Sequence, residues 1–333
     1  MLPHVSEVQH AHGRSLKAAC AAPVEPSRSS SRAYRRVHEL VELYARHDHL
    51  TILLDGESGT GKTLLARELH DQSPRKAQNF QRVTLTALDD NLAASDLFGH
   101  VAGAYTDARS SRPGHFVTAH RGTLFLDEIG KATPALQRKL LQVLESGEFV
   151  PVGSDRTVRV DTRVILATNV GLETLVSSGS FLPDLFARIG YFRISLPALR
   201  DRREDIPGLV RQFVELHAAR VGYREMPDVD EDLMRGLQLA PWPLNLRQLD
   251  ATVQKILILA RGSSWLTLEH CDEDLAFLRC VDGERPPLNE RVVSAAVREC
   301  DGNVSRAARQ LGTARTTVYR YLREGDTRTS GEV

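Results

Sequence analysis

The feature that most constrains this chain is the motif GESGTGKT at residues 56–63. The apolar run LTILLDG before it has the length and composition of a buried parallel strand, and LLARELH after it has helical spacing. The motif fits G-x-x-x-x-G-K-[ST], whose backbone N–H groups surround phosphates between a strand and a helix. The alternative is a glycine-rich turn with an exposed lysine. The predicted binding residues are Gly56, Glu57, Ser58, Gly59, Thr60, Gly61, Lys62 and Thr63.

Within this motif, two side chains have distinct predicted tasks. Lys62 reaches the outer phosphates of ATP, and the Thr63 hydroxyl is a ligand for Mg²⁺. The cofactors predicted from the motif are therefore ATP and Mg²⁺.

Short apolar runs of strand length recur along the first 200 residues. They lie at residues 82–85, 123–127, 162–169 and 192–196, with helical patterns between some of them. Strands that alternate with helices predict an α/β fold, a parallel sheet with helices on both faces. After Pro197 only helical patterns follow, at residues 205–222, 231–238 and 247–260, which predict a small helical domain.

Polar residues end two of these runs. Asp127 and Glu128 follow TLFL, at the sheet edge where open α/β folds bind ligands. Asp127 is suited to bind Mg²⁺, and Glu128 is suited to polarise an attacking water molecule. This pair of roles favours a hydrolase over a kinase. Asn169 ends TRVILATN, where it senses the terminal phosphate or holds water. The alternatives are a solvated acidic turn and an ordinary strand-terminating turn.

Charge and cysteine content exclude several classes of protein. The 43 basic and 43 acidic residues balance, so any surface for nucleic acid must be local. The four cysteines show neither CxxC spacing nor a nearby histidine cluster, which favours reduced thiols over disulfides or zinc. No apolar run approaches the ~18 residues of a membrane span, and no secretory signal is present. We expect a cytoplasmic protein without a membrane partner.

The local basic surface lies near the end of the chain. Residues 290–324 hold seven arginines and four carboxylates, in three short amphipathic segments. Gly312 separates the last two, which predicts a helix-turn-helix whose recognition helix spans residues 313–323. The residues predicted to face base edges are Arg315, Thr316 and Thr317, and those predicted to contact phosphates are Arg320 and Arg323. The alternative is a helical hairpin with a solvated basic face.

Several motifs occur together in a fixed order: GESGTGKT, DLFGHVAGAYTDA, GTLFLDEIG, LQRKLLQVLESGEFVPVG, RVILATN, LPALRDRREDI and WPLNLRQL. In this order the chain resembles the AAA+ domains of bacterial enhancer-binding proteins, the sigma-54-dependent transcription activators, over residues 34–325. The C-terminal segment resembles their Fis-type DNA-binding domain. The resemblance implies an ATPase that forms a ring, a hexamer in this family, and that remodels RNA polymerase sigma-54 holoenzyme. Dimeric DNA-binding domains on upstream double-stranded DNA are also implied.

The resemblance assigns further residues. Arg247 matches the second sensor in the helical lid, and Arg188 matches an arginine finger supplied to the neighbouring subunit. Without the resemblance, both would be read as exposed helix charges. The sigma-contacting loop matches Gly103, Ala104, Tyr105, Thr106, Asp107 and Ala108.

Three residues depart from the family pattern. Leu182 stands where a further arginine is usual, and Thr84 stands where an asparagine restrains the catalytic glutamate. We therefore expect ATP hydrolysis to be slow or differently gated, because an arginine finger can raise the hydrolysis rate by ~10³–10⁵-fold. Asp107 replaces a glycine in the sigma-contacting loop, which adds charge and narrows the accessible backbone conformations.

These departures support an alternative, a DNA-binding regulator whose AAA+ domain serves oligomerisation or nucleotide sensing independently of sigma-54. A P-loop small-molecule kinase is disfavoured by the helix-turn-helix.

The predicted domain organisation has six parts. They are a flexible N-terminal arm at residues 1–33, the AAA+ core at 34–200, the helical lid at 201–278, a linker at 279–289, the helix-turn-helix at 290–325 and a tail at 326–333. No receiver domain fits in the predicted arm. We therefore expect control by partner proteins, by expression level or by the DNA site.

Overall fold

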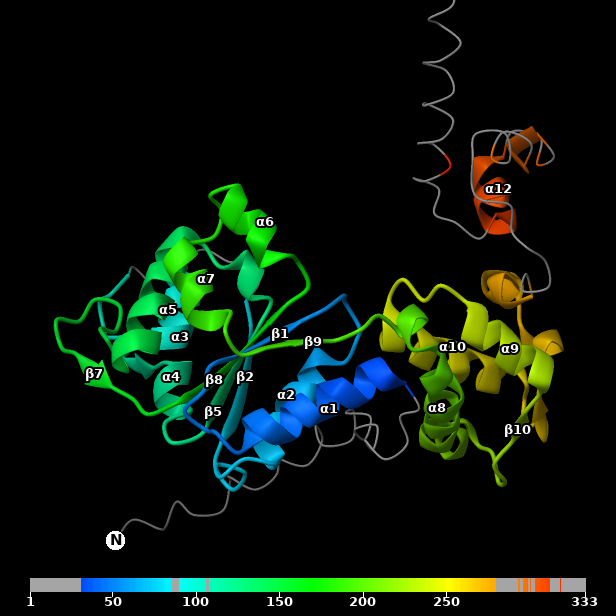
Figure 1. Ribbon diagram of the computed structural model, residues 1–333, viewed down its shortest axis with the longest axis horizontal. Helices are drawn as coiled ribbons and strands as arrows, with labels where there is room; N and C mark the ends of the chain where they lie inside the picture. Colours follow the sequence, from blue (N-terminus) through cyan, green and yellow to red (C-terminus); the bar gives the residue numbers. More distant parts are fainter. Residues whose placement is uncertain are drawn as a thin grey trace, which may run out of the picture.

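The computed structural model describes residues 31–85, 90–105, 108 and 110–279, together with residues 293, 296–298, 300, 303–311 and 318. An α/β core and a helical lid lie side by side, and a short helix near the C-terminus lies next to the lid (Figure 1). This arrangement agrees with the predicted fold class.

The core is built on a five-stranded parallel sheet with the order β2-β5-β8-β1-β9. Each strand overlaps one of the predicted apolar runs. The strands are β1 (Ile52–Asp55), β2 (Phe80–Thr84), β5 (Thr123–Asp127), β8 (Arg163–Thr168) and β9 (Arg193–Ser195). Because all five are parallel, their carboxyl ends meet at one edge of the sheet.

Helices cover both faces of the sheet, as predicted (Figure 1). Side chains of a strand alternate between faces, so Leu53 packs in one hydrophobic cluster and Leu54 in the other. One face carries α1 (Arg32–Ala45) and α2 (Lys62–Asp71). The other carries α3 (Asp90–Phe98), α4 (His115–Thr118), α5 (Pro134–Ser146), α6 (Leu172–Ser177) and α7 (Pro183–Ile189).

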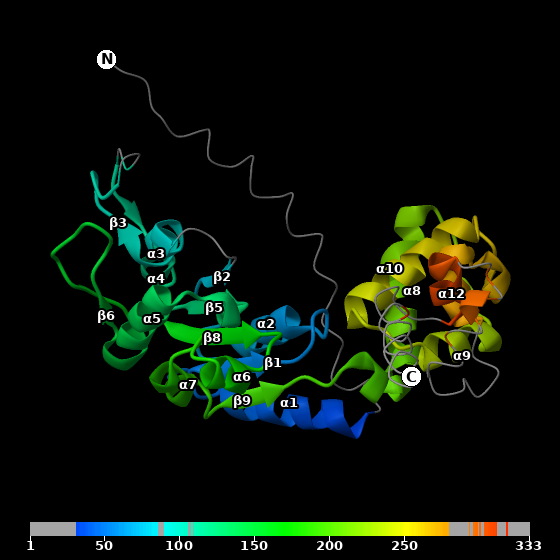
Figure 2. The ribbon, with the colours of Figure 1, turned by 90° about the horizontal axis from the view of Figure 1, so that it is seen from above.

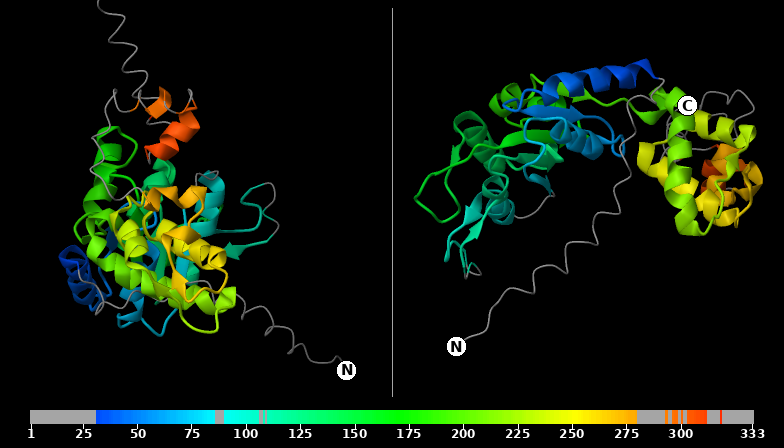
Figure 3. Two further views of the ribbon diagram at one scale, coloured as in Figure 1. Left: turned by 90° about the vertical axis from the view of Figure 1, so that its right-hand side faces the viewer. Right: turned by 90° about the horizontal axis from the view of Figure 1, so that it is seen from below.

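The first helix starts at Arg32. Residues 32 and 33, predicted to belong to the N-terminal arm, are therefore helical. The start of α1 lies against the beginning of the lid (Figure 3), where the Ser31 backbone N–H donates to Asp205 Oδ1 at 2.9 Å. Tyr34 is buried beneath the Arg202 guanidinium, 4.2 Å from its ring centroid. These contacts with residues some 170 positions later extend the helix. Residues 1–30 lie outside the described part.

The lid contains the three predicted helices, α8 (Ile206–Val221), α9 (Glu231–Leu239) and α10 (Asn245–Leu259). They enclose a separate hydrophobic core around Trp242, whose indole N–H donates to the Leu237 carbonyl at 2.7 Å. A short parallel pair, β10 (Asp228–Val229) and β11 (Trp265–Leu266), was not predicted. Beyond the lid, α12 (Val304–Gln310) contacts the 3₁₀ helix Glu273–Leu278.

Two small hairpins extend the core at the end far from the lid (Figure 2). One pairs β3 (Gly99–His100) with β4 (Arg112–Pro113), and the other pairs β6 (Glu148–Phe149) with β7 (Val158–Arg159). A bridge between His100 and Val152 joins the two hairpins.

Candidate functional site

The loop at residues 56–63 connects β1 to α2 and has the backbone that its glycines predict. Gly56, Gly59 and Gly61 have φ angles of +146°, +78° and +108°, a region that other residues rarely adopt. A Cβ atom on Gly59 would lie 2.1 Å from the Leu244 carbonyl oxygen. The loop therefore lies directly against the lid, with no space for a side chain between them.

Lys62 is folded onto this loop. Its Nζ donates to the carbonyl oxygens of Gly56 at 2.7 Å and Glu57 at 2.9 Å. Burial lowers the pKa of Lys62, whereas the negative charges of Asp127, Asp55 and Glu128 act to raise it. The ammonium group is thus close to the loop and to the acidic residues at the sheet edge, where an outer phosphate would replace the carbonyl contacts.

Three side chains tie the loop to the lid, and we call Glu57, Arg200 and Asn245 the loop clasp. Arg200 forms a two-bond ion pair with Glu57, with contacts of 2.8 Å and 2.5 Å. Asn245, which is fully buried, donates to the Ser58 carbonyl at 2.9 Å and to Glu57 Oε2 at 3.2 Å, and accepts from the Leu199 N–H at 2.7 Å. The Arg200 guanidinium and then the Asn245 amide lower the pKa of Glu57 to about 2.

Further lid contacts reach the loop backbone. Arg202 donates to the Thr60 carbonyl at 3.1 Å, and the Leu246 N–H donates to the Gly59 carbonyl at 2.9 Å. A Cβ atom added to Gly59 would lie 3.3 Å from the Cβ of Arg247. The positive charge of Arg247 acts to lower the pKa of Lys62. The fold therefore brings Arg247, predicted as the second sensor, to the phosphate loop.

The acidic pair lies at the carboxyl edge of the sheet, as its position after a strand predicts. Asp127 Oδ2 accepts from Arg82 of β2 at 3.0 Å. Glu128 has a φ angle of +62° and forms an ion pair with Lys131. On the other side, Thr168 at the end of β8 pairs in register with Asp55 of β1. Asn169, the next residue, is exposed near this edge.

The oxygen donors at this edge fit a magnesium nucleotide. A hydroxyl from Thr63 and a carboxylate from Asp127 are ligand types that Mg²⁺ prefers, with phosphate oxygens and water filling its other positions. Within the described ranges, no group of three or more His, Cys, Asp or Glu side chains could hold a metal ion. A metal at this edge would therefore depend on the nucleotide for part of its coordination.

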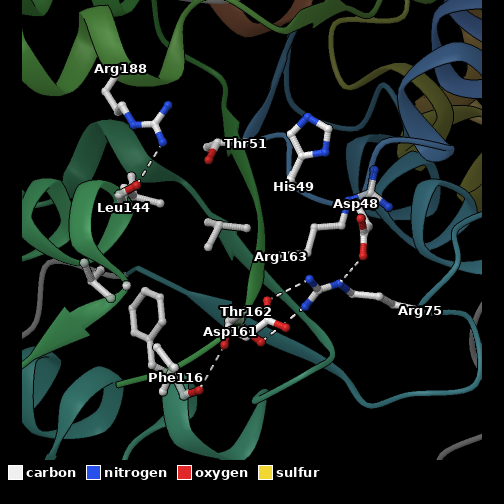
Figure 4. A pocket seen from close by; sticks show the side chains of 14 residues that line it. Asp48, His49, Thr51, Arg75, Phe116, Leu144, Asp161, Thr162, Arg163 and Arg188 are labelled. Atoms are coloured by element: carbon white, nitrogen blue, oxygen red, sulfur yellow. Dashed lines mark hydrogen bonds and ion pairs between the residues drawn. The ribbon is translucent and has the colours of Figure 1, made fainter. Parts of the chain in front are cut away.

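Arg188 lies away from the phosphate loop. It lines a cavity of about 210 Å³ at the amino edge of the sheet, together with Thr51, Thr162 and Arg163 (Figure 4). Its guanidinium donates to the Leu144 carbonyl at 2.9 Å. Arg188 therefore cannot reach the nucleotide site of its own chain without a large rearrangement of the core.

Four residues of the predicted sigma-contacting loop are described. The Gly103 N–H donates to the Ala108 carbonyl at 2.8 Å, and the Ala108 N–H donates to the Tyr105 carbonyl at 2.9 Å. The ring of Tyr105 lies 5.1 Å from that of His100. These contacts close a tight loop between β3 and β4. Thr106 and Asp107 lie outside the described residues.

The predicted DNA-contacting residues, Arg315, Thr316, Thr317, Arg320 and Arg323, also lie outside the described residues. Nearby, Val293, Ala308 and Val318 form a small buried cluster that includes α12. In the part of the chain that is described, neither Cys271 nor Cys300 forms a disulfide. No helix there is long and apolar enough to cross a membrane.

Sequence reasoning missed a second ion-pair group at the sheet edge. Arg193 of β9 donates to both carboxylate oxygens of Asp55 at 2.9 Å and also pairs with Glu173 of α6. The Ser195 hydroxyl donates to Asp55 at 2.8 Å. The parallel register of β1 and β9 could indicate these neighbours only after the strand order was known.

Comparison with known proteins decides the family. The profile described as the sigma-54 interaction domain matches residues 28–195. The chain belongs to this family. Residues 200–279 match the AAA+ ATPase lid domain, and residues 287–325 match the bacterial regulatory protein, Fis family.

Curated relatives of this sigma-54 interaction domain protein are longer than the chain. It is 37% identical over 305 residues to the DNA-binding transcriptional regulator NtrC of Klebsiella pneumoniae, covering 83% of this chain and 65% of NtrC. It is 43% identical over 236 residues to the Nif-specific regulatory protein of Herbaspirillum seropedicae, covering 71% of this chain and 42% of that protein. The crystal structure of NtrX from Brucella abortus in complex with ATP matches with a TM-score of 0.66 and 32% identity, covering 89% of this chain and 68% of NtrX.

Proposed function

We propose that this chain is a sigma-54-dependent transcription regulator that binds upstream DNA and couples ATP hydrolysis to remodelling of RNA polymerase holoenzyme. The observation that carries the proposal is the phosphate loop fixed beneath the lid, with Lys62 and the acidic pair beside it, in a sigma-54 interaction domain protein. Named relatives are transcriptional regulators, and a similar structure was determined in complex with ATP.

Each residue at the site has a separate task in the proposed reaction. The loop residues and Lys62 bind the phosphates, while Thr63 and Asp127 would hold Mg²⁺, which supplies charge neutralisation for phosphoryl transfer when bound. Glu128 orients the attacking water and accepts its proton. Asn169 and Arg247 report the state of the terminal phosphate to the core and to the lid.

A ring of subunits accounts for the position of Arg188. Because Arg188 lies at the opposite edge of the sheet from its own phosphate loop, it acts on the nucleotide of a neighbouring chain. We propose a hexameric ring in the cytoplasm, with dimeric helix-turn-helix domains. The separate hydrophobic cores of the sheet and the lid support a domain division near residue 200.

A second candidate function is a DNA-binding regulator whose AAA+ domain senses nucleotide or drives assembly without sigma-54. Two observations favour it. Leu182 precedes α7 at the position of a usual arginine, and the two acids of the pair are both held by cations of the chain, Arg82 and Lys131. Both observations point to weak hydrolysis.

Nucleotide binding and turnover by the full chain test the proposed site. Lys62→Ala should lose ATP binding, whereas Glu128→Ala should bind ATP and lose hydrolysis. Lys76→Ala, at an exposed lysine in the turn after α2, is the matched control and should behave like wild type. Unchanged binding in Lys62→Ala would reject the nucleotide site, and unchanged turnover in Glu128→Ala would remove Glu128 from its assigned task.

A further inference from the structure

Both carboxylates of the acidic pair contact a positively charged side chain of the same chain. Asp127 accepts from Arg82 at 3.0 Å, and Glu128 pairs with Lys131. The two ion pairs differ in their surroundings, because the Asp127 side chain is 13% exposed and that of Glu128 is 28% exposed. Glu128, the proposed proton acceptor, is therefore held by a cation that water can reach.

The backbone after β5 places Lys131 next to Glu128. Glu128 adopts a left-handed conformation, and the 3₁₀ helix Ile129–Lys131 follows immediately. The Lys131 N–H donates to the Glu128 carbonyl at 2.9 Å, which brings the side chains at positions i and i+3 together. Ile129 is fully buried and fixes the turn in the core. Lys131 thus contacts Glu128 because of the turn itself.

The neighbouring strand offers Glu128 no comparable contact. Thr84 ends β2 in register with Asp127 and is exposed. Among the described residues, no hydrogen bond joins the Thr84 side chain to Glu128. The contact that restrains Glu128 in this structure therefore comes from the turn that follows it and not from the adjacent strand.

The same turn packs against the end of β8. A Cβ atom on Gly130 would lie 2.5 Å from Val170 Cγ2 and 3.4 Å from Thr168 Oγ1. These two residues flank Asn169, the proposed sensor of the terminal phosphate. The turn that carries Lys131 therefore lies directly against the two residues on either side of Asn169, and this contact is a route by which a shift at the end of β8 reaches the turn.

We propose that Lys131 is a positioning residue that holds Glu128 in a resting arrangement until a shift at the end of β8 moves the turn. This inference rests on the proposed function, because it takes Glu128 as the group that activates water. The ion pair keeps the Glu128 carboxylate turned toward Lys131, and its release frees the carboxylate to accept a proton from water.

The test compares Lys131→Gln and Lys131→Arg in the full chain. The Gln variant should raise kcat for ATP hydrolysis about two- to fivefold, the range that corresponds to loss of a partly exposed ion pair. KM should not change, and the Arg variant should stay close to wild type. ATP binding without Mg²⁺ should remain within about twofold of wild type in both variants, because Lys131 contacts Glu128 and lies outside the phosphate loop.

Arg36→Gln is the matched control, because Arg36 forms an i, i+3 ion pair with Glu39 on the outer surface of α1. It should leave kcat, KM and ATP binding unchanged. An equal or lower kcat in Lys131→Gln would overturn the inference, as would a loss of Mg²⁺-free ATP binding, which would make Lys131 a phosphate ligand.

The same variants separate this inference from the proposed function. If wild type does not hydrolyse ATP but Lys131→Gln does, the restraint by Lys131 is supported and is stronger than expected. If neither protein hydrolyses ATP, both the inference and the proposed enzymatic activity are wrong. Adding Glu128→Ala to Lys131→Gln should abolish the gain, and a gain that persists would show that Lys131 does not act through Glu128.

Discussion

At the scale of single residues, the phosphate loop depends on charges that its own motif does not contain. Glu57 is held by Arg200 and Asn245, and Asp55, the residue before the loop, is held by Arg193. Each pair joins the loop to an element that lies well over a hundred residues later. The loop's shape comes from its glycines, but its position under the lid comes from these contacts.

The loop clasp predicts a specific dependence of stability on pH. The folded-state pKa of Glu57, about 2, lies below its ordinary value of 4.5, so the ion pair stabilises the fold above pH 4.5. This contribution is lost as the pH falls from 4.5 towards 2. Because both side chains are partly exposed, it amounts to about 1 kcal/mol.

Urea unfolding of wild type and Arg200→Gln at pH 6 and pH 3 checks this prediction. The variant should be less stable at pH 6, and the difference should shrink by about half or more at pH 3. A difference that stays constant between the two pH values would show that Arg200 stabilises the protein by packing and not through the charge of Glu57.

Removing Arg193 should weaken ATP binding through an uncompensated charge. The negative charge of Asp55 acts to raise the pKa of Lys62. In Arg193→Gln this carboxylate, which directly precedes the phosphate loop, loses its main ion-pair partner. We expect binding roughly fivefold weaker, equivalent to about 1 kcal/mol of repulsion. Equilibrium binding of a fluorescent ATP analogue measures it. The double variant Arg193→Gln/Asp55→Asn removes the charge and should recover most of the affinity; no recovery would contradict the electrostatic explanation.

At the scale of elements, the close contact between the phosphate loop and the start of α10 couples the core to the lid. The Leu246 N–H bonds to Gly59, and Leu244 leaves no room for a side chain there. Any change of lid angle must therefore move or break the contact at Gly59. In the proposed function, this contact would carry a change at the loop to the lid.

Gly59→Ala should therefore abolish ATP binding and lower the free energy of unfolding by about 3 kcal/mol or more, because left-handed strain adds to a clash with backbone. Gly179→Ala is the matched control, since Gly179 has a φ angle of +72° but no atom within 4 Å of its added Cβ. It should cost only about 1–2 kcal/mol and leave binding intact. Equal effects of the two substitutions, measured by chemical denaturation and ATP binding, would show that the contact with the lid is unimportant.

The elements themselves were largely predictable from sequence, whereas their contacts were not. All five strands overlap predicted runs. The signal is strongest for β1, β5 and β8, which are buried on both faces, and weaker for the edge strands β2 and β9, which are partly exposed. The first turn of α1 was missed because RAYRR has no apolar period, and its burial depends on Arg202 and Asp205 of a distant segment. Phosphate-loop residues were predicted from their motif, but Arg193 and Arg200 carry no local signal of Asp55 and Glu57, which lie 138 and 143 positions earlier in the chain.

At the scale of the whole molecule, the nucleotide site and Arg188 lie at opposite edges of one sheet. In the proposed mechanism, Arg188 of one chain therefore acts at the phosphate loop of a neighbouring chain. The head-to-tail association that we propose would bring the two together, and such an interface forms a ring when the rotation between subunits closes. In this proposed arrangement, ATP hydrolysis depends on assembly.

Mixing two inactive variants tests this arrangement. Arg188→Ala should bind ATP but lose about 10³-fold or more of its turnover, while Lys62→Ala should not bind ATP. In a mixture, the Lys62→Ala chain supplies Arg188 to the intact phosphate loop of the other chain, so ATP hydrolysis should partly recover. No recovery in mixtures that are shown to assemble would contradict action between subunits.

The central claim, that ATP turnover by this chain serves transcription with sigma-54, is tested most directly by open-complex formation in vitro. The template carries a sigma-54 promoter and an upstream site selected with the purified protein from random-sequence DNA. Wild type with holoenzyme and ATP should form open complexes, whereas Lys62→Ala should form none. If wild type forms no ATP-dependent open complexes, the claim is contradicted; recovery in Asp107→Gly would then place the block at the sigma-contacting loop.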